Sequence, residues 1–405
     1  MSGRDPKLHA RGAAVGEAPH FGERVDYLDW LRILALLGVF VFHTLRPFDN
    51  DYWHVKNGHQ SQLLTDVLIS IGSWGLAFFF LIAGAGTYLA LRWRTGSRYV
   101  QERLLRLLIP LIVGWVLLGP VQFWLEEHHH GISDDPFLPT ASRYLGDPFG
   151  ELPTLLENAY HLWFVVFLLE YCLLGLPLFI WLRQSRGQRF VDRVGRFATH
   201  RGGALVLVAP VAIVTVALGS QFVGEEHGWW QWAYFFGFFL LGHLVMTDQR
   251  LTAAVRRDLV PALAMGIGGL AAIFALDAPG FFEAWDGHSW SWRYVTLFVL
   301  IAAQAWGWVL ALWSLGMRFG GFRRPVPRTV GEGAMPFFLL HQPAILAVAF
   351  VVVAWSITVP VKWLAIIVAS FVLTVALAWA LSRLPAVSRL LGVKHRVTSH
   401  VQVKG

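Results

Sequence analysis

The sequence predicts an all-α fold, namely a polytopic membrane helix bundle of about ten transmembrane helices with both termini in the cytosol. Three observations predict it. Of the 405 residues, 56% are hydrophobic and only 15% are charged, whereas soluble domains usually carry about 25% charged residues. The apolar residues gather in long runs, and the loops between the runs alternate in the sign of their charge. A large soluble core does not fit this composition.

The apolar runs give the number of helices. A helix that crosses a bilayer needs about 20 mostly apolar residues. Only helices and closed barrels can span, and these runs are too long and too evenly apolar for barrel strands. Ten runs qualify, at residues 26–45, 64–91, 104–125, 160–182, 203–221, 229–246, 259–276, 291–316, 333–355 and 361–382.

The charges between the runs give the topology. Loops 92–106, 183–201, 247–258 and 317–330 together hold 18 Lys or Arg and 4 Asp or Glu. The alternate loops hold 4 Lys or Arg and 14 Asp or Glu; they are 46–63, 126–159, 222–228, 277–290 and 356–362. Basic loops stay in the cytosol. The net charge of +7 therefore indicates membrane topology and does not indicate a nucleic-acid partner.

Three parts of the chain differ in composition. Residues 1–23 are polar and lack an apolar segment with a cleavage site, so we expect a flexible cytosolic tail and no signal peptide. Residues 24–385 hold the ten runs and form the integral-membrane domain, and residues 386–405 form a second cytosolic tail. The single cysteine, Cys172, cannot form an internal disulfide and has no metal-ligand set near it.

The first run, LDWLRILALLGVFVFHTL, carries Arg32 and His43 inside a segment that is otherwise apolar. Charged groups within spans cost roughly 2.5–3.5 kcal/mol each, so they tend to be functional and to face the bundle interior. Eleven residues bring the two side chains to within about 20° of the same helix face, about 16 Å apart along the axis. The spacing predicts one polar stripe, with Arg32 nearer the cytosol and His43 deeper. Interfacial placement and snorkelling are the structural alternatives.

Three further sets of polar residues are candidates. Arg103 and Arg106 lie one turn apart where the third run leaves the cytosol, which suits a phosphate-rich ligand because guanidinium binds phosphate bidentately. Ordinary cytosolic charge explains them equally well. The other two sets are His161 with Trp163, as substrate-binding candidates in the fourth run, and Glu332 with His341, as possible catalytic partners of His43 in the ninth.

The run EEHHHGISDDP, which begins at Glu126, resembles a metal site at first reading. His128, His129 and His130 are adjacent, so no helix or strand points all three at one ion, and metal sites usually space their histidines. We therefore predict no metal site and interpret the run as part of a solvated, acidic outer loop.

Five motifs, in order, resemble one family. They are RVDYLDWLRILALLGVFVFH, GLAFFFLIAGAGTYLA, ERLLRLLIP, HLWFVVFLLEY and FFLLHQP. Together with ten spans, they resemble the integral-membrane acyltransferase 3 family, and in particular its glucan-biosynthesis-protein-C-like branch. The resemblance covers about residues 24–385. One departure is AG at 83–84, where the family commonly has SG.

The resemblance implies an activity. The family takes an acyl group, such as acetyl or succinyl, from cytosolic acyl-CoA and delivers it to a hydroxyl of an extracytoplasmic glycan or lipid-linked sugar. It implies that His43 is the essential histidine, that Arg32 is its partner in the motif, and that Arg103 and Arg106 lie on the donor side. It further implies a multi-pass protein of the bacterial inner membrane, with acyl-CoA as a substrate and no permanently bound cofactor.

Histidine suits such chemistry because its ordinary pKa lies near neutrality, so it can take the proton of an attacking hydroxyl. An acyl-histidine intermediate is the competing mechanism, and the sequence leaves both open. The competing class of protein is a transporter or flippase for a polar or lipid-linked molecule, because buried Arg and His also mark transport pathways. The absence of an internal sequence repeat disfavours that class.

Overall fold

The computed structural model describes residues 26–146, 159–219, 228–277, 291–319 and 325–392. Every element in these ranges is a helix, as predicted, and none is a strand. The predicted tail 1–23 lies outside the described residues, as does the part of the predicted tail 386–405 beyond residue 392. The side of the membrane on which each terminus lies stays a prediction.

The helices are, in order, α1 (Asp26–Leu45), η1 (Arg46–Phe48), α2 (Gln62–Leu91), α3 (Gly96–Arg103), η2 (Leu104–Leu108), α4 (Ile109–His130), α5 (Phe137–Gly146), η3 (Tyr160–Leu162), α7 (Trp163–Leu174), α8 (Leu176–Leu182), α9 (Ser185–Ala198), α10 (Gly203–Val206), α11 (Ala209–Gly219), α12 (Trp229–Val245), α13 (Gln249–Arg257), α14 (Leu259–Asp277), α15 (Trp292–Arg318), α16 (Arg328–Val352), α17 (Val359–Ser382) and α18 (Pro385–Leu390).

All ten predicted spans fall on helices, but not all of these helices can cross a membrane. Within the described residues, seven are long and apolar enough, and an eighth results if the pair Tyr160–Leu174 and Leu176–Leu182, bent by 43°, is one span. Run 203–221 is split between the short α10 and α11, and run 229–246 is a helix of 17 residues, α12. The count of ten is therefore not confirmed.

The bend between α7 and α8 has a local cause. Gly175 separates the two helices and Pro177 lies in the first turn of α8. Proline lacks the N–H that would continue the hydrogen-bond ladder of α7, so the helix breaks there. His161, in η3, and Glu170, in α7, both precede the bend.

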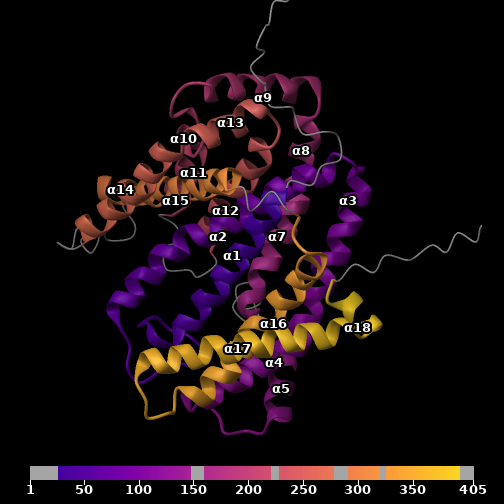
Figure 1. The fold of residues 1–405 in the computed structure, drawn as a ribbon, viewed down its shortest axis with the longest axis vertical. Helices are drawn as coiled ribbons and strands as arrows, with labels where there is room; N and C mark the ends of the chain where they lie inside the picture. Colours follow the sequence, from indigo (N-terminus) through magenta and orange to yellow (C-terminus); the bar gives the residue numbers. More distant parts are fainter. Residues whose placement is uncertain (1–25, 147–158, 220–227, 278–290, 320–324, 393–405) are drawn as a thin grey trace, which may run out of the picture.

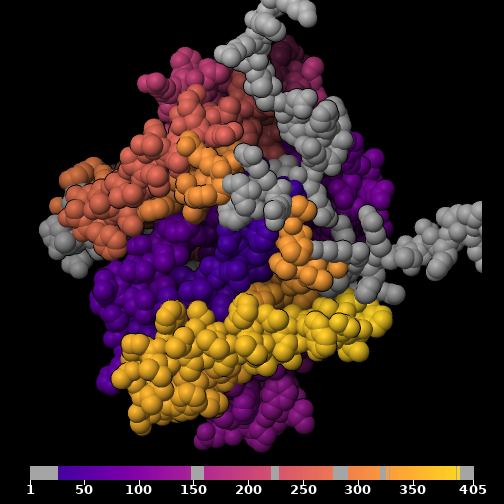
Figure 2. Space-filling view, in the orientation of Figure 1, coloured from indigo at the N-terminus to yellow at the C-terminus, as the bar shows by residue number. Residues whose placement is uncertain are grey.

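Helix α1 lies at the centre of the bundle. Figure 1 shows α1 and α2 between the pair α14–α15 above and the pair α16–α17 below, and α1 contacts α2, α15, α16 and α17. In Figure 2 the surface of α1 and α2, in indigo, lies between the orange and yellow surfaces of these two pairs. The N-terminal half of α1 packs into one apolar core through Leu28 and Leu31, and the C-terminal half packs into another through Leu36 and Phe40.

Helices α2 and α12 cross at two glycines. A Cβ atom on Gly84 would lie 1.9 Å from the carbonyl oxygen of Phe239, and one on Gly242 would lie 1.9 Å from that of Leu81. Small residues allow backbones to approach in this way, and such contacts hold membrane helices together. Gly84 belongs to the AG pair at 83–84, so the residue on which this crossing depends is unaffected by the departure from SG.

A π-helical segment, η2, interrupts the rod formed by α3 and α4. It spans Leu104–Leu108, directly after Arg103 and around Arg106. In a π-helix each residue turns the chain through a smaller angle than in an α-helix, so residues three apart no longer lie one above the other. Such segments are frequent at functional sites.

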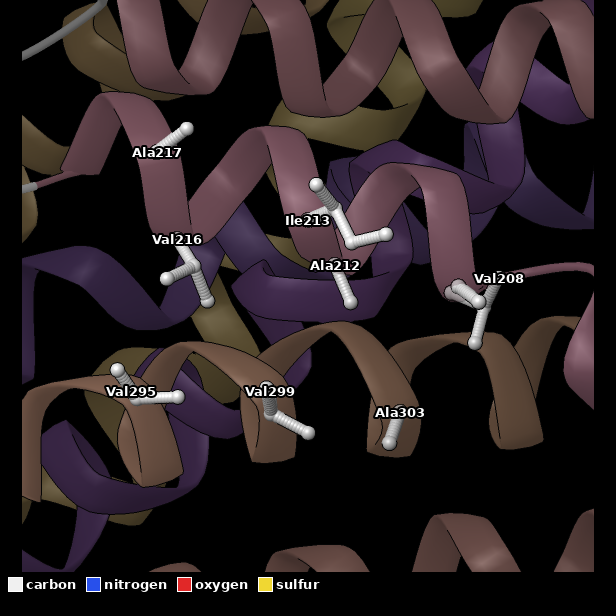
Figure 3. Close-up of a pocket in the computed structure, with 9 residues that line it drawn as sticks. Val208, Ala212, Ile213, Val216, Ala217, Val295, Val299 and Ala303 are labelled. Atoms are coloured by element: carbon white, nitrogen blue, oxygen red, sulfur yellow. The ribbon is translucent and has the colours of Figure 1, made fainter. Parts of the chain in front are cut away.

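A shallow apolar groove of about 480 Å³ lies between α11 and α15. Figure 3 shows one wall, formed by Ile213 and Val216 of α11 and by Val208 just before it, beside Val295 and Val299 of α15. All its lining side chains are aliphatic, so the groove offers no group for catalysis. None of the predicted site residues lines it.

Candidate active site

The structure brings two of the predicted residues into direct contact. His43, near the end of α1, places its Nδ1 atom 3.0 Å from Nε2 of His341 in α16. The Nδ1 atom of His341 in turn lies 2.5 Å from the carbonyl oxygen of Phe338. His341 is fully buried and His43 partly so. The sequence leaves the side-chain partner of His43 open among Glu332, His341 and a neighbour from another span, and in the structure the partner is His341.

This chain of contacts fixes the protons on both neutral rings. A carbonyl oxygen can only accept, so Nδ1 of His341 carries its proton and Nε2 of His341 holds the lone pair. Nδ1 of His43 must then be the donor to His341, which leaves the lone pair of His43 on Nε2. The atom of this pair that can act as a base or nucleophile is Nε2 of His43.

His161, in η3, is the third histidine of the site. Its ring centre lies 5.0 Å from that of His341, nearly perpendicular to it, and its Nε2 atom donates to the carbonyl oxygen of Leu339 at 3.2 Å. That oxygen is free because residue 343, four positions later, is a proline and has no N–H to donate. Pro343 thus creates the anchor for His161.

The other nitrogen of His161, Nδ1, is buried and has no hydrogen-bond partner in the part of the chain that the structure describes. Because Nε2 carries the proton, Nδ1 is a lone-pair acceptor next to the His43–His341 pair. Buried polar atoms are nearly always satisfied in folded proteins, so an orphan of this kind calls for a reason. A hydroxyl or amide donor of a bound substrate would supply its missing partner.

Aromatic side chains wall the pair. Trp53, from the loop after η1, stacks on His43 with ring centres 6.3 Å apart, and Phe337 is parallel to His341 at 6.3 Å. Phe40 packs against Phe337 from α1. These walls exclude water, which strengthens the hydrogen bonds inside the site.

Arginines gather at the opposite end of α1. Glu102 Oε1 lies 2.9 Å from Nε of Arg94, and Glu102 Oε2 lies 3.8 Å from Nη2 of Arg106. The positive charges of Arg94, Arg103 and Arg32 all act on Arg106. Nε of Arg98 lies 3.6 Å from the same carboxylate, so Glu102 pairs with three guanidinium groups, which is an arrangement suited to an anion with several phosphates.

Sequence comparison adds a family to this geometry. The model of a family described as an acyltransferase domain matches residues 25–383. The chain belongs to this acyltransferase family. Its relatives include the glucans biosynthesis protein C of Salmonella heidelberg (strain SL476) and that of Salmonella dublin. Each is 24% identical over 329 residues, which are 79% of this chain and 82% of the relative. No solved structure matches the chain.

The family and the apolar helices together make this protein a multi-pass membrane acyltransferase. Arg32 lies about 16 Å from His43 along the unbroken helix α1. Its side chain is 52% exposed and lies 3.8 Å from Asp29. The acyltransferase therefore has its histidines and its arginines at two ends of one helix.

Three other predicted residues lie apart from the His43–His341 pair. Glu332 precedes His341 by nine residues of α16, so it lies about 13.5 Å away along the axis. Trp163 packs against Phe167 and Phe235, with ring centres 5.3 and 6.1 Å away. Arg103 turns from Arg106 across the π-helical segment and stacks over Tyr99 at 4.8 Å.

The interpretation of the EEHHH run as a solvated loop is wrong. Residues 126–130 are the last residues of α4, and the three histidine side chains reach three different backbone groups. His128 contacts the carbonyl of Trp124, His129 accepts from the N–H of Lys56, and His130 contacts the carbonyl of Trp53. Within the described residues no group of His, Cys, Asp and Glu is placed to hold a metal ion.

Sequence reasoning missed several residues around the histidines, namely Trp53, His54, Glu126 and Tyr160. The first two lie in a loop that carries no periodic signal. One signal was available, because Pro343 follows Leu339 by four residues and so releases its carbonyl. That rule identifies a free acceptor within α16, although not the donor that takes it.

Proposed function

We propose that the protein is an O-acyltransferase of the bacterial inner membrane. It moves an acetyl or succinyl group from cytosolic acyl-CoA to a hydroxyl of an extracytoplasmic glycan or lipid-linked sugar. The observation that supports this most is the hydrogen-bonded chain from Phe338 through His341 to His43, because it leaves a basic nitrogen inside a membrane protein of an acyltransferase family.

The proposed reaction is direct transfer. Nε2 of His43 takes the proton of the acceptor hydroxyl while the hydroxyl oxygen attacks the thioester carbonyl carbon. The carbon–sulfur bond then breaks, and the same nitrogen returns the proton to the departing thiolate, so that an ester and free CoA result. His341 stabilises the imidazolium form of His43 by accepting a hydrogen bond from its Nδ1–H group, as the orienting residue does in other imidazole-based sites.

The two ends of α1 give the two substrates separate roles. We assign the arginines around Glu102, which include Arg94 and Arg106, to the phosphates of acyl-CoA, with Arg32 contributing to the same positive field. The thioester then reaches along the stripe of α1 towards His43. We assign Nδ1 of His161 to the acceptor, since a sugar hydroxyl supplies the hydrogen that this atom lacks.

Membranes that contain the protein would be supplied with radiolabelled acetyl-CoA or succinyl-CoA, and label would be followed into alkali-labile esters. We expect His43→Ala to abolish labelling and His200→Ala, at an exposed position outside the site, to leave it unchanged. Unchanged labelling in His43→Ala would remove this residue from the mechanism. Label that stays on the protein would indicate an acyl-histidine intermediate. If no acyl-CoA stabilised the protein against thermal unfolding, a transporter would be favoured.

The role of His341 has a graded test. His341→Leu leaves the Nδ1–H group of His43 without an acceptor, and a hydrogen bond to a charged group contributes about 1.5–3 kcal/mol. We expect kcat to fall by about ten- to 150-fold. His341→Gln keeps an amide oxygen as acceptor and should lose less. Equal losses in the two variants would contradict the orienting role.

A further inference from the structure

Glu126 is a largely buried carboxylate that the proposed reaction does not use. It lies in the last turn of α4, which ends where Gly131 takes a left-handed conformation, φ 66°, and donates its N–H to the carbonyls of Glu127 and His128. Only 14% of the Glu126 side chain is exposed. The structure thus places a carboxylate close to the end of a membrane helix and turns it inward.

Three side chains converge on Glu126. Oε1 accepts the hydroxyl of Tyr52 at 2.5 Å, and Oε2 accepts the hydroxyl of Tyr160 at 2.9 Å. Nδ1 of His54 lies 3.0 Å from Oε1 in an ion-pair contact that is not a linear hydrogen bond. Burial of the Tyr52 hydroxyl, followed by the hydrogen bond and the charge of Glu126, raises the pKa of Tyr52, so this group stays a donor.

Tyr160 is held in a strained conformation. Its φ is +50°, and no other non-glycine residue in the described ranges has a positive φ. A bulky side chain pays steric strain in this region, and such a residue persists only where its surroundings determine its position. The next residue is His161, whose Nε2 meets the released carbonyl of Leu339. The left-handed turn at Tyr160 therefore decides where the ring of His161 lies.

We propose that Glu126 is a positioning residue of the acyltransferase site: its bond to the hydroxyl of Tyr160 holds the left-handed turn, and the turn holds His161 beside His341. This inference rests on the proposed function, because the proposed function assigns His161 to the binding of the acceptor. Two anchors act on His161 from opposite directions, the carbonyl of Leu339 on its ring and the Glu126–Tyr160 bond on its backbone.

The ring contacts of this region are consistent with a rigid unit. His54 lies edge-to-face against Tyr160 at 4.7 Å, and Tyr52 stacks on His130 at 5.4 Å. A change at Glu126 is thus transmitted to the acceptor side of the site, whereas the arginines lie at the far end of α1.

The neighbouring residue is a matched control. Glu127 is also buried, but both its oxygens pair with Arg143 of α5, at 3.1 and 2.6 Å. Glu126→Ala and Glu127→Ala therefore remove the same group from adjacent positions of one helix, and only the first loosens Tyr160. Tyr160→Phe removes the hydroxyl bond from the other side.

The experiment is a double-mutant cycle on acyl transfer to the acceptor, with donor binding measured separately as stabilisation by acetyl-CoA against heat. We expect Glu126→Ala and Tyr160→Phe each to lower kcat/KM for the acceptor about tenfold or more, and the double variant to lose no more than the worse single. Glu126→Gln, which still accepts the tyrosine hydroxyl, should recover most of the rate. Glu127→Ala should lower the unfolding temperature and leave kcat/KM within about twofold.

A second readout does not depend on activity. Carbethoxylation of His161 by diethyl pyrocarbonate, followed by mass spectrometry, should be several-fold faster in Glu126→Ala than in wild type, with exposed His200 as the internal reference. Multiplicative losses in the cycle, an equal effect of Glu127→Ala, or unchanged His161 reactivity would overturn the proposal. Absence of transfer in wild type would overturn the proposed function, and the reactivity of His161 would then decide on the positioning role alone.

Discussion

Replacement of Pro343 by alanine tests whether a missing backbone N–H organises the site. An interior proline costs roughly 3 kcal/mol in a helix. Alanine removes that cost, but it loses about two buried carbon atoms, worth roughly 1.6 kcal/mol. It also restores the N–H that takes the Leu339 carbonyl from His161, at about 1 kcal/mol. The free energies nearly cancel, so the unfolding temperature should hardly change.

Acyl transfer should fall in this variant although the fold is intact. Nε2–H of His161, now 3.2 Å from its acceptor, loses that acceptor, and a loss of about 0.5–1.5 kcal/mol in positioning corresponds to about two- to tenfold in rate. Thermal unfolding and label transfer would be measured on the same preparations, with Pro336→Ala, the other interior proline of α16, as control. Wild-type transfer by Pro343→Ala, or an equal loss in Pro336→Ala, would refute the reasoning.

Three further predictions concern other parts of the chain. Arg106→Gln should raise KM for acyl-CoA several-fold and leave kcat nearly unchanged, with the difference shrinking at high salt; a fall in kcat alone would speak against a donor site there. Gly84→Ala should lower the unfolding temperature by several degrees, since its Cβ atom meets a carbonyl at 1.9 Å, whereas Gly86→Ala, with nothing within 4 Å, should not. Hydrogen bonding from Arg250 lowers the pKa of Asp248 in the folded protein. The stability that this carboxylate contributes is therefore present above its unfolded-state pKa and is lost as the pH falls through its folded-state pKa. Thermal unfolding across pH should show Asp248→Asn to be less stable than wild type at pH 7 and equal to it in strong acid.

Much of the fold follows from composition, because the bilayer leaves a chain few choices. A run of about 20 apolar residues must become a helix in lipid, and all ten predicted runs did. The number of spans does not follow as directly. Whether α10 and α11, or the 17 residues of α12, cross the membrane depends on how these helices pack and tilt. The hydropathy of the sequence does not determine packing or tilt.

The site was predictable where one helix carries two residues. Arg32 and His43 lie on one helix, so their separation follows from its geometry alone. The contact between His43 and His341 joins residues 298 positions apart and depends on how α1 and α16 pack. The strained backbone of Tyr160 is invisible in a sequence, because nothing in a tyrosine signals a positive φ. The residues next to Glu126 in the sequence predict only a charged side chain at the surface.

The π-helical segment has a consequence for the whole rod from Gly96 to His130. One surplus residue in a helix shifts all that follows by about 100° of phase. Arg94 and Arg103 precede this shift and Glu126 follows it, so deletion of one residue between positions 104 and 108 would rotate the two ends of the rod relative to each other. The number of residues between the two ends of the rod thus sets the angle at which each end faces the bundle. In this acyltransferase the length of that segment matters as much as the identity of its polar residues.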